Sequence, residues 1–280
     1  MPEVSAPAEL RARIETWRQQ AQRILFVPTM GNLHAGHLAL VERARSLGGR
    51  VVVSIFVNPT QFAPDEDFAS YPRTLAADRE RLAAEHVDLL FTPEVAAVYP
   101  QGVQTDTSYK VPAVGQGLEA DFRPGHFDGV VTVVRRLFEL VTPDVAVFGE
   151  KDYQQLAVIR AMVRDLQLPI GIESVPTVRE ADGLALSSRN QYLSATERAA
   201  APLLQRTLKA VADSVGRGDR DFSRLESSAV ERLREGGFAP DYVSIRAADD
   251  LQPLPSGAGH GVVLAAARLG RARLIDNVIF

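Results

Sequence analysis

The chain has 280 residues, a formal net charge of −4, 46% hydrophobic and 24% charged residues, and no cysteine. This is ordinary for a globular protein and long enough for one large domain or two smaller ones. The mild negative charge argues against binding of nucleic acid by the whole molecule, and the lack of cysteine excludes disulfides and thiolate chemistry. No apolar run reaches the ~18 residues of a membrane span, and the N-terminus lacks a secretory-signal pattern, so we expect a cytoplasmic protein without membrane partners.

The first part of the sequence alternates apolar segments with helical ones. An amphipathic helix is predicted around Leu10, Ile14 and Trp17, which lie at helical spacing. Buried strands are predicted at 24–27, 51–57, 87–91, 145–148 and 170–178, and further helices at about 31–47, 73–85, 130–141 and 153–166. Continuous apolar strands separated by helices are typical of a parallel sheet covered on both faces. We therefore predict a doubly wound, Rossmann-like α/β domain over residues 1–178.

The order of elements changes after residue 178. Helices are predicted at 195–215 and 222–234, followed by strands at 242–246, 262–267 and 273–279. Helices first and strands later indicate a smaller α+β domain over residues 179–280, which could close over the first domain as a lid.

The strongest chemical signal is the segment PTMGNLHAGH at 28–37, between the first predicted strand and its helix. In a doubly wound sheet ligands bind at this edge, and the N-terminus of a helix suits phosphate. His34 and His37 are three residues apart and should face the same side, where they could donate hydrogen bonds to phosphate oxygens. The alternatives are that the two histidines are structural or capping residues, or that they bind zinc, although no third zinc ligand lies nearby in the sequence.

Two later segments carry side chains of the same chemistry. In the segment 148–155, Gly149 permits a tight turn, Lys151 is one of only three lysines, and Asp152 could accept ribose hydrogen bonds or cap the next helix. In the segment LSSRN at 186–190, two hydroxyls and Arg189 could clamp a triphosphate. A solvated turn and a polar interdomain linker are the respective alternatives.

Two further loops could be walls of the same site. The connection 58–71 is longer than the usual 2–6 residues and includes Gln61. The segment 122–127 could offer Arg123 or His126 to an acidic substrate. Each is equally well explained as an ordinary surface loop or turn.

Together these segments resemble the pantothenate synthetase (pantoate–β-alanine ligase) family. The matching motifs, which span nearly the whole chain in order, are PTMGNLHAGH (28–37), FVNPTQF (56–62), YPRTL (71–75), RPGHFDGV (123–130), VFGEKDYQQL (147–156), DGLALSSRN (182–190) and ARLIDN (272–277). The resemblance implies an ATP- and Mg²⁺-dependent condensation of pantoate with β-alanine through a pantoyl adenylate, giving pantothenate, AMP and pyrophosphate. It also implies a homodimer formed through the nucleotide-binding domain.

The resemblance also implies roles for particular residues. Gln61 and Gln155 would bind pantoate, and Gln61 would also lie near β-alanine. Catalysis would rest on His37, His34, Lys151 and Arg189. The implied ATP ligands are Met30, Gly31, Asn32, Leu33, His34, Ala35, Gly36, His37, Gly149, Glu150, Lys151, Asp152, Val178, Leu186, Ser187, Ser188 and Arg189.

One position departs from the family pattern, and two other functions compete with the ligase. Some members carry paired acids after the YPRT motif, whereas here Ala77 precedes a single Asp78, so we expect no protein ligand for Mg²⁺. A nucleotidyltransferase with the same H-x-G-H phosphate site would share the histidines but would need a second phosphate pocket where Gln61 and Gln155 lie. A nucleotide-sensing protein would bind ATP without forming AMP.

Overall fold

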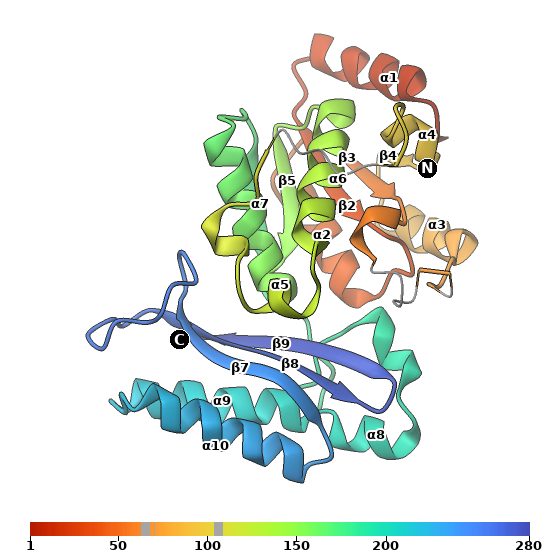
Figure 1. The fold of residues 1–280 in the computed structure, drawn as a ribbon. Helices are drawn as coiled ribbons and strands as arrows, with labels where there is room; N and C mark the ends of the chain where they lie inside the picture. Colours follow the sequence, from red (N-terminus) through yellow and green to blue (C-terminus); the bar gives the residue numbers. More distant parts are fainter. Residues whose placement is uncertain (63–67, 70, 104–108) are drawn as a thin grey trace.

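The computed structural model describes residues 1–62, 68–69, 71–103 and 109–280. They form a six-stranded parallel sheet flanked by helices and, below it in Figure 1, a three-stranded antiparallel sheet with its own helices. The predicted fold class, a doubly wound α/β domain with a smaller α+β domain, is confirmed. Within these ranges no helix is both long and apolar enough to cross a membrane.

The large sheet has the strand order β1-β4-β3-β2-β5-β6, and every pairing in it is parallel. Its strands are β1 (Glu3–Val4), β2 (Ile24–Thr29), β3 (Arg50–Ile55), β4 (Leu89–Phe91), β5 (Val145–Gly149) and β6 (Gly171–Val175). The chain builds outward from β2 through β3 to β4, and later returns to place β5 on the other side of β2. The carboxyl ends of β2 and β5 therefore flank the reversal of strand order, where doubly wound sheets bind their ligands.

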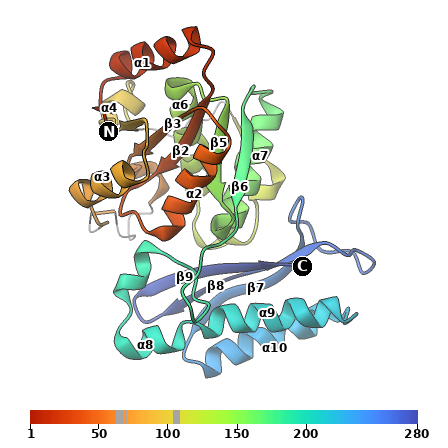
Figure 2. The same ribbon diagram turned by 180° about the vertical axis from the view of Figure 1, so that it is seen from behind.

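Helices cover both faces of this sheet, as Figures 1 and 2 show from opposite sides. Side chains alternate along β2: Ile24 and Phe26 join one apolar cluster, and Leu25 and Val27 join the other. The first cluster lies under α1 (Pro7–Gln19), α6 (His126–Val141) and α7 (Tyr153–Asp165), and the second lies under α2 (Ala35–Ser46) and α3 (Leu75–Ala84). Burial on both faces explains why the strands read as continuous apolar runs.

Short helical segments follow several strand ends and hold the loops of the sheet edge. They are η1 (Pro59–Gln61), α4 (Val95–Val98), η2 (Ala113–Gly115), α5 (Glu119–Phe122), η3 (Glu150–Asp152) and η4 (Ser188–Tyr192). The predicted long connection 58–71 begins with η1, and its residues 63–67 and 70 lie outside the described residues.

The smaller domain is a helical layer on a sheet. Its elements are α8 (Ala195–Ala200), α9 (Leu203–Gly216), α10 (Phe222–Glu235), β7 (Ala239–Ala247), β8 (Gly261–Leu269) and β9 (Ala272–Ile279). α9 and α10 pack on one face of the sheet around a separate apolar cluster, and the other face is turned toward the large domain (Figure 1).

Two sequence predictions about elements differ from the structure, and one strand was not predicted. The single helix predicted at 195–215 is two helices, because Pro202 interrupts the run between α8 and α9 and has no N–H to donate. The strand predicted to reach residue 178 ends at Val175, just before Pro176. β1 was not predicted, since two residues are too short to show a pattern.

Candidate active site

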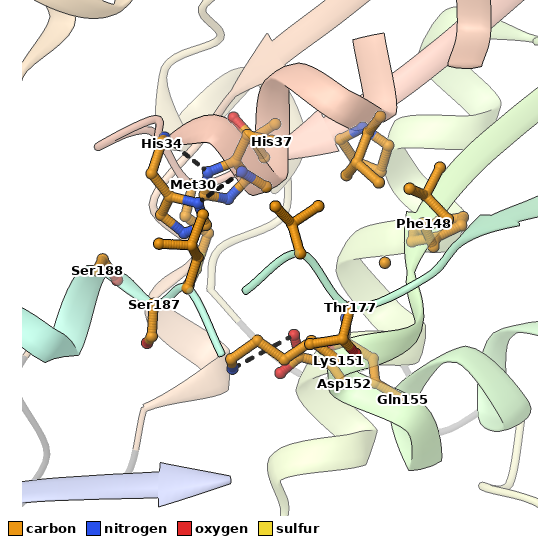
Figure 3. A pocket seen from close by; sticks show the side chains of 18 of the residues that line it. Met30, His34, His37, Phe148, Lys151, Asp152, Gln155, Thr177, Ser187 and Ser188 are labelled. Atoms are coloured by element: carbon orange, nitrogen blue, oxygen red, sulfur yellow. Dashed lines mark hydrogen bonds and ion pairs between the residues drawn. The ribbon is translucent and has the colours of Figure 1, made fainter. Parts of the chain in front are cut away.

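A cavity of about 230 Å³ opens at the carboxyl ends of β2 and β5. Figure 3 shows His34, His37 and Met30 above it, Lys151, Asp152 and Gln155 below it, and Ser187 and Ser188 to one side. Segments that are far apart in the sequence thus meet at one point. The predicted site residues that line the cavity are Met30, His34, Gly36, His37, Gln61, Gly149, Lys151, Asp152, Gln155, Val178, Leu186, Ser187, Ser188 and Arg189.

The loop between β2 and α2 is held in place by the buried carboxylate of Asp78. This carboxylate accepts hydrogen bonds from the backbone N–H of Asn32 at 2.9 Å and of Leu33 at 2.8 Å, and from the Thr74 hydroxyl at 3.0 Å. Gly31 has a φ of +80°, and a Cβ there would meet Asp78 Oδ2 at 3.2 Å. Asp78 therefore shapes the approach to the histidines and is already occupied by protein donors.

The rings of His34 and His37 lie against each other, with their centroids 4.1 Å apart. His34 is the N-cap of α2, and its Nδ1 accepts a hydrogen bond from the Gly36 N–H at 3.2 Å. The Nδ1 of His37 accepts from the His34 N–H at 3.3 Å. The capping alternative and the shared-face prediction are thus both found in the structure, and Nε2 remains as the donor of each ring.

Both imidazoles are neutral at pH 7. Burial, reinforced by the nearby positive charge of Lys151, lowers the pKa of His34 to about 4. Burial and the adjacent His34 ring lower the pKa of His37 to about 3. A neutral ring whose Nδ1 accepts from the backbone carries its proton on Nε2, so each histidine can donate one hydrogen bond into the cavity.

Gly36 leaves room for this arrangement. A Cβ at Gly36 would lie 2.9 Å from Cε1 of the His34 ring and 3.9 Å from Cβ of Leu186. A side chain at this position would crowd the histidine ring and approach the loop that carries Leu186.

The turn η3 brings a cation to the opposite wall of the cavity. The Nζ atom of Lys151 lies 4.0 Å from Oδ2 of Asp152, and the lysine side chain is four-fifths buried. Asp152 precedes α7 but makes no capping hydrogen bond with its side chain, so the capping alternative for this residue is wrong. Gln155 lines the cavity, whereas the neighbouring Gln154 is buried and bonds the backbone of residues 114–119.

The third wall is a hairpin that leads into η4. The Leu186 N–H donates to the Val178 carbonyl at 3.0 Å and closes the hairpin. The Ser187 hydroxyl then accepts from the Arg189 N–H at 3.2 Å, which starts η4. Two hydroxyls and a guanidinium are thereby presented from a short, internally bonded turn.

Gln61 is fixed through both its side chain and its backbone. Its Oε1 accepts from Asn58 Nδ2 at 3.0 Å, so Nε2 is the donor that it can offer to a ligand. Its carbonyl accepts from Arg123 at 3.3 Å and lies 3.1 Å from Nδ1 of His126. Arg123 and His126 do not line the main cavity and act on Gln61 instead.

Five of the predicted ATP ligands do not line this cavity: Gly31, Asn32, Leu33, Ala35 and Glu150. Leu33 is buried, and the Glu150 carboxylate accepts from the Ser174 hydroxyl at 2.8 Å. The sequence alone does not show which residues of a motif line the cavity and which are only their neighbours along the chain.

The sequence analysis did not identify the apolar wall of the cavity. That wall includes Leu40, Phe56, Val133, Val134, Leu137 and Phe148. A signal was present in α6, where residues 130–134 are buried without a break and so cannot all face the sheet. This run shows that α6 is buried on more than one side, and Val133, Val134 and Leu137 line the cavity.

The described residues contain no group of three or more histidine and carboxylate side chains that could hold a metal ion. Among the described residues, Asp152 is the only acidic side chain that lines the cavity, and its carboxylate lies near the ammonium of Lys151.

Comparison with known proteins gives consistent matches. Residues 3–279 match the family model for pantoate-β-alanine ligase. A pantothenate synthetase of Stutzerimonas stutzeri is 57% identical over 97% of this chain and 95% of its own length, and one of Methylococcus capsulatus is 55% identical over 99% and 96%.

Solved structures agree with these sequence matches. A pantothenate synthetase of Thermus thermophilus superposes with a TM-score of 0.92 at 49% identity, covering 99% of both chains. A pantoate-β-alanine ligase of Francisella tularensis, solved with "Beta-gamma ATP" and β-alanine, gives 0.84 at 35% identity, covering 100% of this chain and 97% of its own.

Proposed function

Because the chain belongs to the pantoate–β-alanine ligase family and is a ligase of that kind, we propose that it works through a pantoyl-adenylate intermediate. In the first step a pantoate carboxylate oxygen bonds to the α-phosphorus of ATP and pyrophosphate leaves. In the second step the amine of β-alanine attacks the acyl carbon, loses a proton, and AMP leaves. Neither step needs a nucleophile from the protein.

The observation that carries this proposal is the convergence of three donor-bearing segments on one cavity. His34 and His37, Lys151 and the Ser187–Arg189 loop line the same cavity. Donors that are fixed before the reaction stabilise the charge that develops on phosphate oxygens more effectively than mobile water does. We assign the triphosphate of ATP to this space, with His37, His34, Lys151 and Arg189 as the catalytic residues.

Gln61 and Gln155 are the proposed pantoate ligands. Pantoate carries hydroxyl groups and two methyl groups, and the cavity offers amides together with the apolar side chains of α6. Uncharged amides orient a hydroxy acid without neutralising the carboxylate that must attack phosphorus. This wall suits a small hydroxy acid better than the second phosphate group that a nucleotidyltransferase would bind.

A protein cage for Mg²⁺ does not fit the described residues, because Asp78 is occupied by backbone donors and no cluster of ligands is present among them. We propose that Mg²⁺ arrives bound to the triphosphate and water, as this ion often does. We assign no step to a metal–protein contact.

The remaining parts of the proposal concern the whole protein. We place the domain boundary after Val178, since the large apolar clusters lie on either side of it. A small cluster of Leu118, Leu251, Val262 and Leu264 joins the two sides, and residues 179–280 would act as the lid. Family resemblance supports a cytoplasmic homodimer formed through the large domain. Light scattering of the purified protein tests the dimer, which a mass of 30.5 kDa would contradict.

The test of function omits one substrate at a time. With ATP and pantoate but no β-alanine, the enzyme should release pyrophosphate and form pantoyl adenylate; added β-alanine should then yield pantothenate and AMP. ATP with β-alanine alone should release nothing. Absence of pantoate-dependent pyrophosphate would reject the proposal, and a dinucleotide product would identify a nucleotidyltransferase.

A further inference from the structure

The strand β9 contacts two of the three walls of the cavity. It is an edge strand of the small sheet, paired with β8 on one side only, and it packs against both η3 and η4. These two turns carry Lys151 on one wall and Arg189 on another. The ARLIDN segment at 272–277 lies within this strand, and the proposed chemistry assigns it no role.

Asn277 ties β9 to the lysine turn. Its side chain is buried, with 5% of its surface exposed, and Nδ2 donates to the carbonyls of Glu150 at 2.8 Å and Lys151 at 3.0 Å. Two bonds from one planar amide fix the orientation of the peptide groups on which the Lys151 side chain is carried. Loss of this amide would leave both carbonyls without the donor that orients them.

Asp276 ties the same strand to the hairpin. Its buried carboxylate accepts two bonds from Arg179, at 2.7 and 2.9 Å, and Arg179 also donates to the carbonyls of Gly183 and Asn277. Arg179 follows Val178 directly and pairs with Ala185 across the hairpin. The two-pronged bond therefore fixes the base of the loop that carries Ser187 to Arg189.

We propose that Asp276 and Asn277 are positioning residues that set the Lys151 turn and the Ser187–Arg189 loop at a fixed separation for adenylation. They do not line the main cavity, so they act through Lys151 and through Arg179. The inference rests on the proposed function, because the separation matters only if both turns hold one triphosphate.

The test is a double-mutant cycle between Asn277→Ala and Lys151→Ala, read as single-turnover pyrophosphate release with ATP and pantoate. We expect Lys151→Ala to slow this step roughly a hundredfold and Asn277→Ala about tenfold. In the Lys151→Ala background, Asn277→Ala should slow pyrophosphate release by less than about threefold, because the lysine side chain that Asn277 positions is gone. Pantoate affinity should stay at the wild-type value in Asn277→Ala.

Val211→Ala is the control for stability, since Val211 is buried in the small-domain core among other apolar side chains. It should lower the midpoint of thermal unfolding while keeping the wild-type rate. A wild-type rate in Asn277→Ala, an undiminished tenfold loss in the Lys151→Ala background, or an equal loss in Val211→Ala would each overturn the inference. If Asn277→Ala does not fold, Asn277→Ser enters the same cycle, because its short hydroxyl cannot bond both carbonyls.

The wild-type protein separates this inference from the proposed function. Pantoate-dependent pyrophosphate release by the wild type tests the function alone, whereas the coupling between the two substitutions tests the positioning role.

Discussion

The imidazoles of His34 and His37 each bond the backbone through one nitrogen, and the other is the proposed donor to a ligand. Both Nδ1 atoms accept backbone N–H groups at the start of α2. Burial holds both rings neutral at pH 7, with pKa values of about 4 and about 3. Capping and catalysis are therefore compatible in these residues, and a substitution that removes the ring changes both at once.

Paired substitutions of His37 separate the two roles. An asparagine amide can occupy the Nδ1 position and keep the bond from the His34 N–H, whereas a glutamine amide can reach toward the Nε2 position. We expect His37→Asn to keep the unfolding free energy within about 0.5 kcal/mol of wild type but to lower turnover about a hundredfold. His37→Gln should retain more activity and lose about 1 kcal/mol of stability with the cap. Urea unfolding and steady-state kinetics check both, and full turnover in His37→Asn would leave His37 a cap only.

The turn η1 is positioned by its contact with Gly129 of α6. The Gly129 carbonyl accepts hydrogen bonds from Asn58 and Thr60, and a Cβ at Gly129 would lie 2.1 Å from the Thr60 carbonyl oxygen. The turn could not pack this closely on any other residue. The position of Gln61 thus depends on the lack of a side chain at Gly129, which lies 68 residues later in the sequence.

Gly129→Ala tests this contact. Alanine normally favours a helix over glycine by about 1 kcal/mol, but here the added methyl group must displace the backbone of η1 and carry Gln61 with it. We expect a loss of about 1–3 kcal/mol in unfolding free energy and a rise in the KM for pantoate that exceeds the rise for ATP.

The matched control is Gly216→Ala at the end of α9, where a Cβ would have no neighbour within 4 Å. This substitution should leave the kinetics unchanged and stabilise the protein by about 0.4–1 kcal/mol. Equal KM values for pantoate in Gly129→Ala and wild type would show that Gln61 does not depend on the contact.

The same elements show how far sequence reasoning reaches. Strand and helix types were predictable because burial on both faces leaves long apolar runs. The sheet-edge rule placed the segments of His34 and Lys151 at strand ends, and both residues line one cavity in the structure. The bond from His126 to the Gln61 carbonyl and the approach of Gly129 to Thr60 were not predictable. They depend on which side of α6 faces η1, and a helix that is apolar on more than one side does not reveal this.

A polar link between the two domains is centred on Glu119. This buried carboxylate of α5 accepts two bonds from Arg273 of β9, at 2.7 and 2.8 Å, and one from the Tyr242 hydroxyl at 3.0 Å. It also lies 3.9 Å from Arg123, which bonds the Gln61 carbonyl. Arg273, Glu119 and Arg123 thus form a series of charged contacts from the small sheet to Gln61, the proposed pantoate ligand.

Glu119→Gln should weaken the packing of the two domains against each other. The substitution removes the charge that accepts two bonds from Arg273, whose Nε keeps its ion pair with Asp241 at 2.7 Å. We therefore expect a loss of about 1.5–3 kcal/mol in unfolding free energy at pH 7, the range for hydrogen bonds to charged groups. Burial alone would raise the pKa of Glu119, but the bonds and charge of Arg273 outweigh it and hold the pKa below the usual value of 4.5. The ionised group therefore stabilises the wild type fully above pH 4.5, and this contribution declines as the pH falls through the lowered pKa.

Glu139→Gln is the comparison, because Glu139 forms exposed ion pairs with Arg135 and Arg136 on α6. Exposed pairs contribute roughly 0–1 kcal/mol, so this variant should unfold almost as the wild type does. Urea unfolding from pH 7 down to 4 should show a large gap between Glu119→Gln and wild type that begins to close at the acid end. Hydrogen exchange at pH 7 should show earlier loss of protection in β7–β9 of Glu119→Gln. A gap no larger than that of Glu139→Gln would mean that the Glu119–Arg273 pair does not hold the domains together.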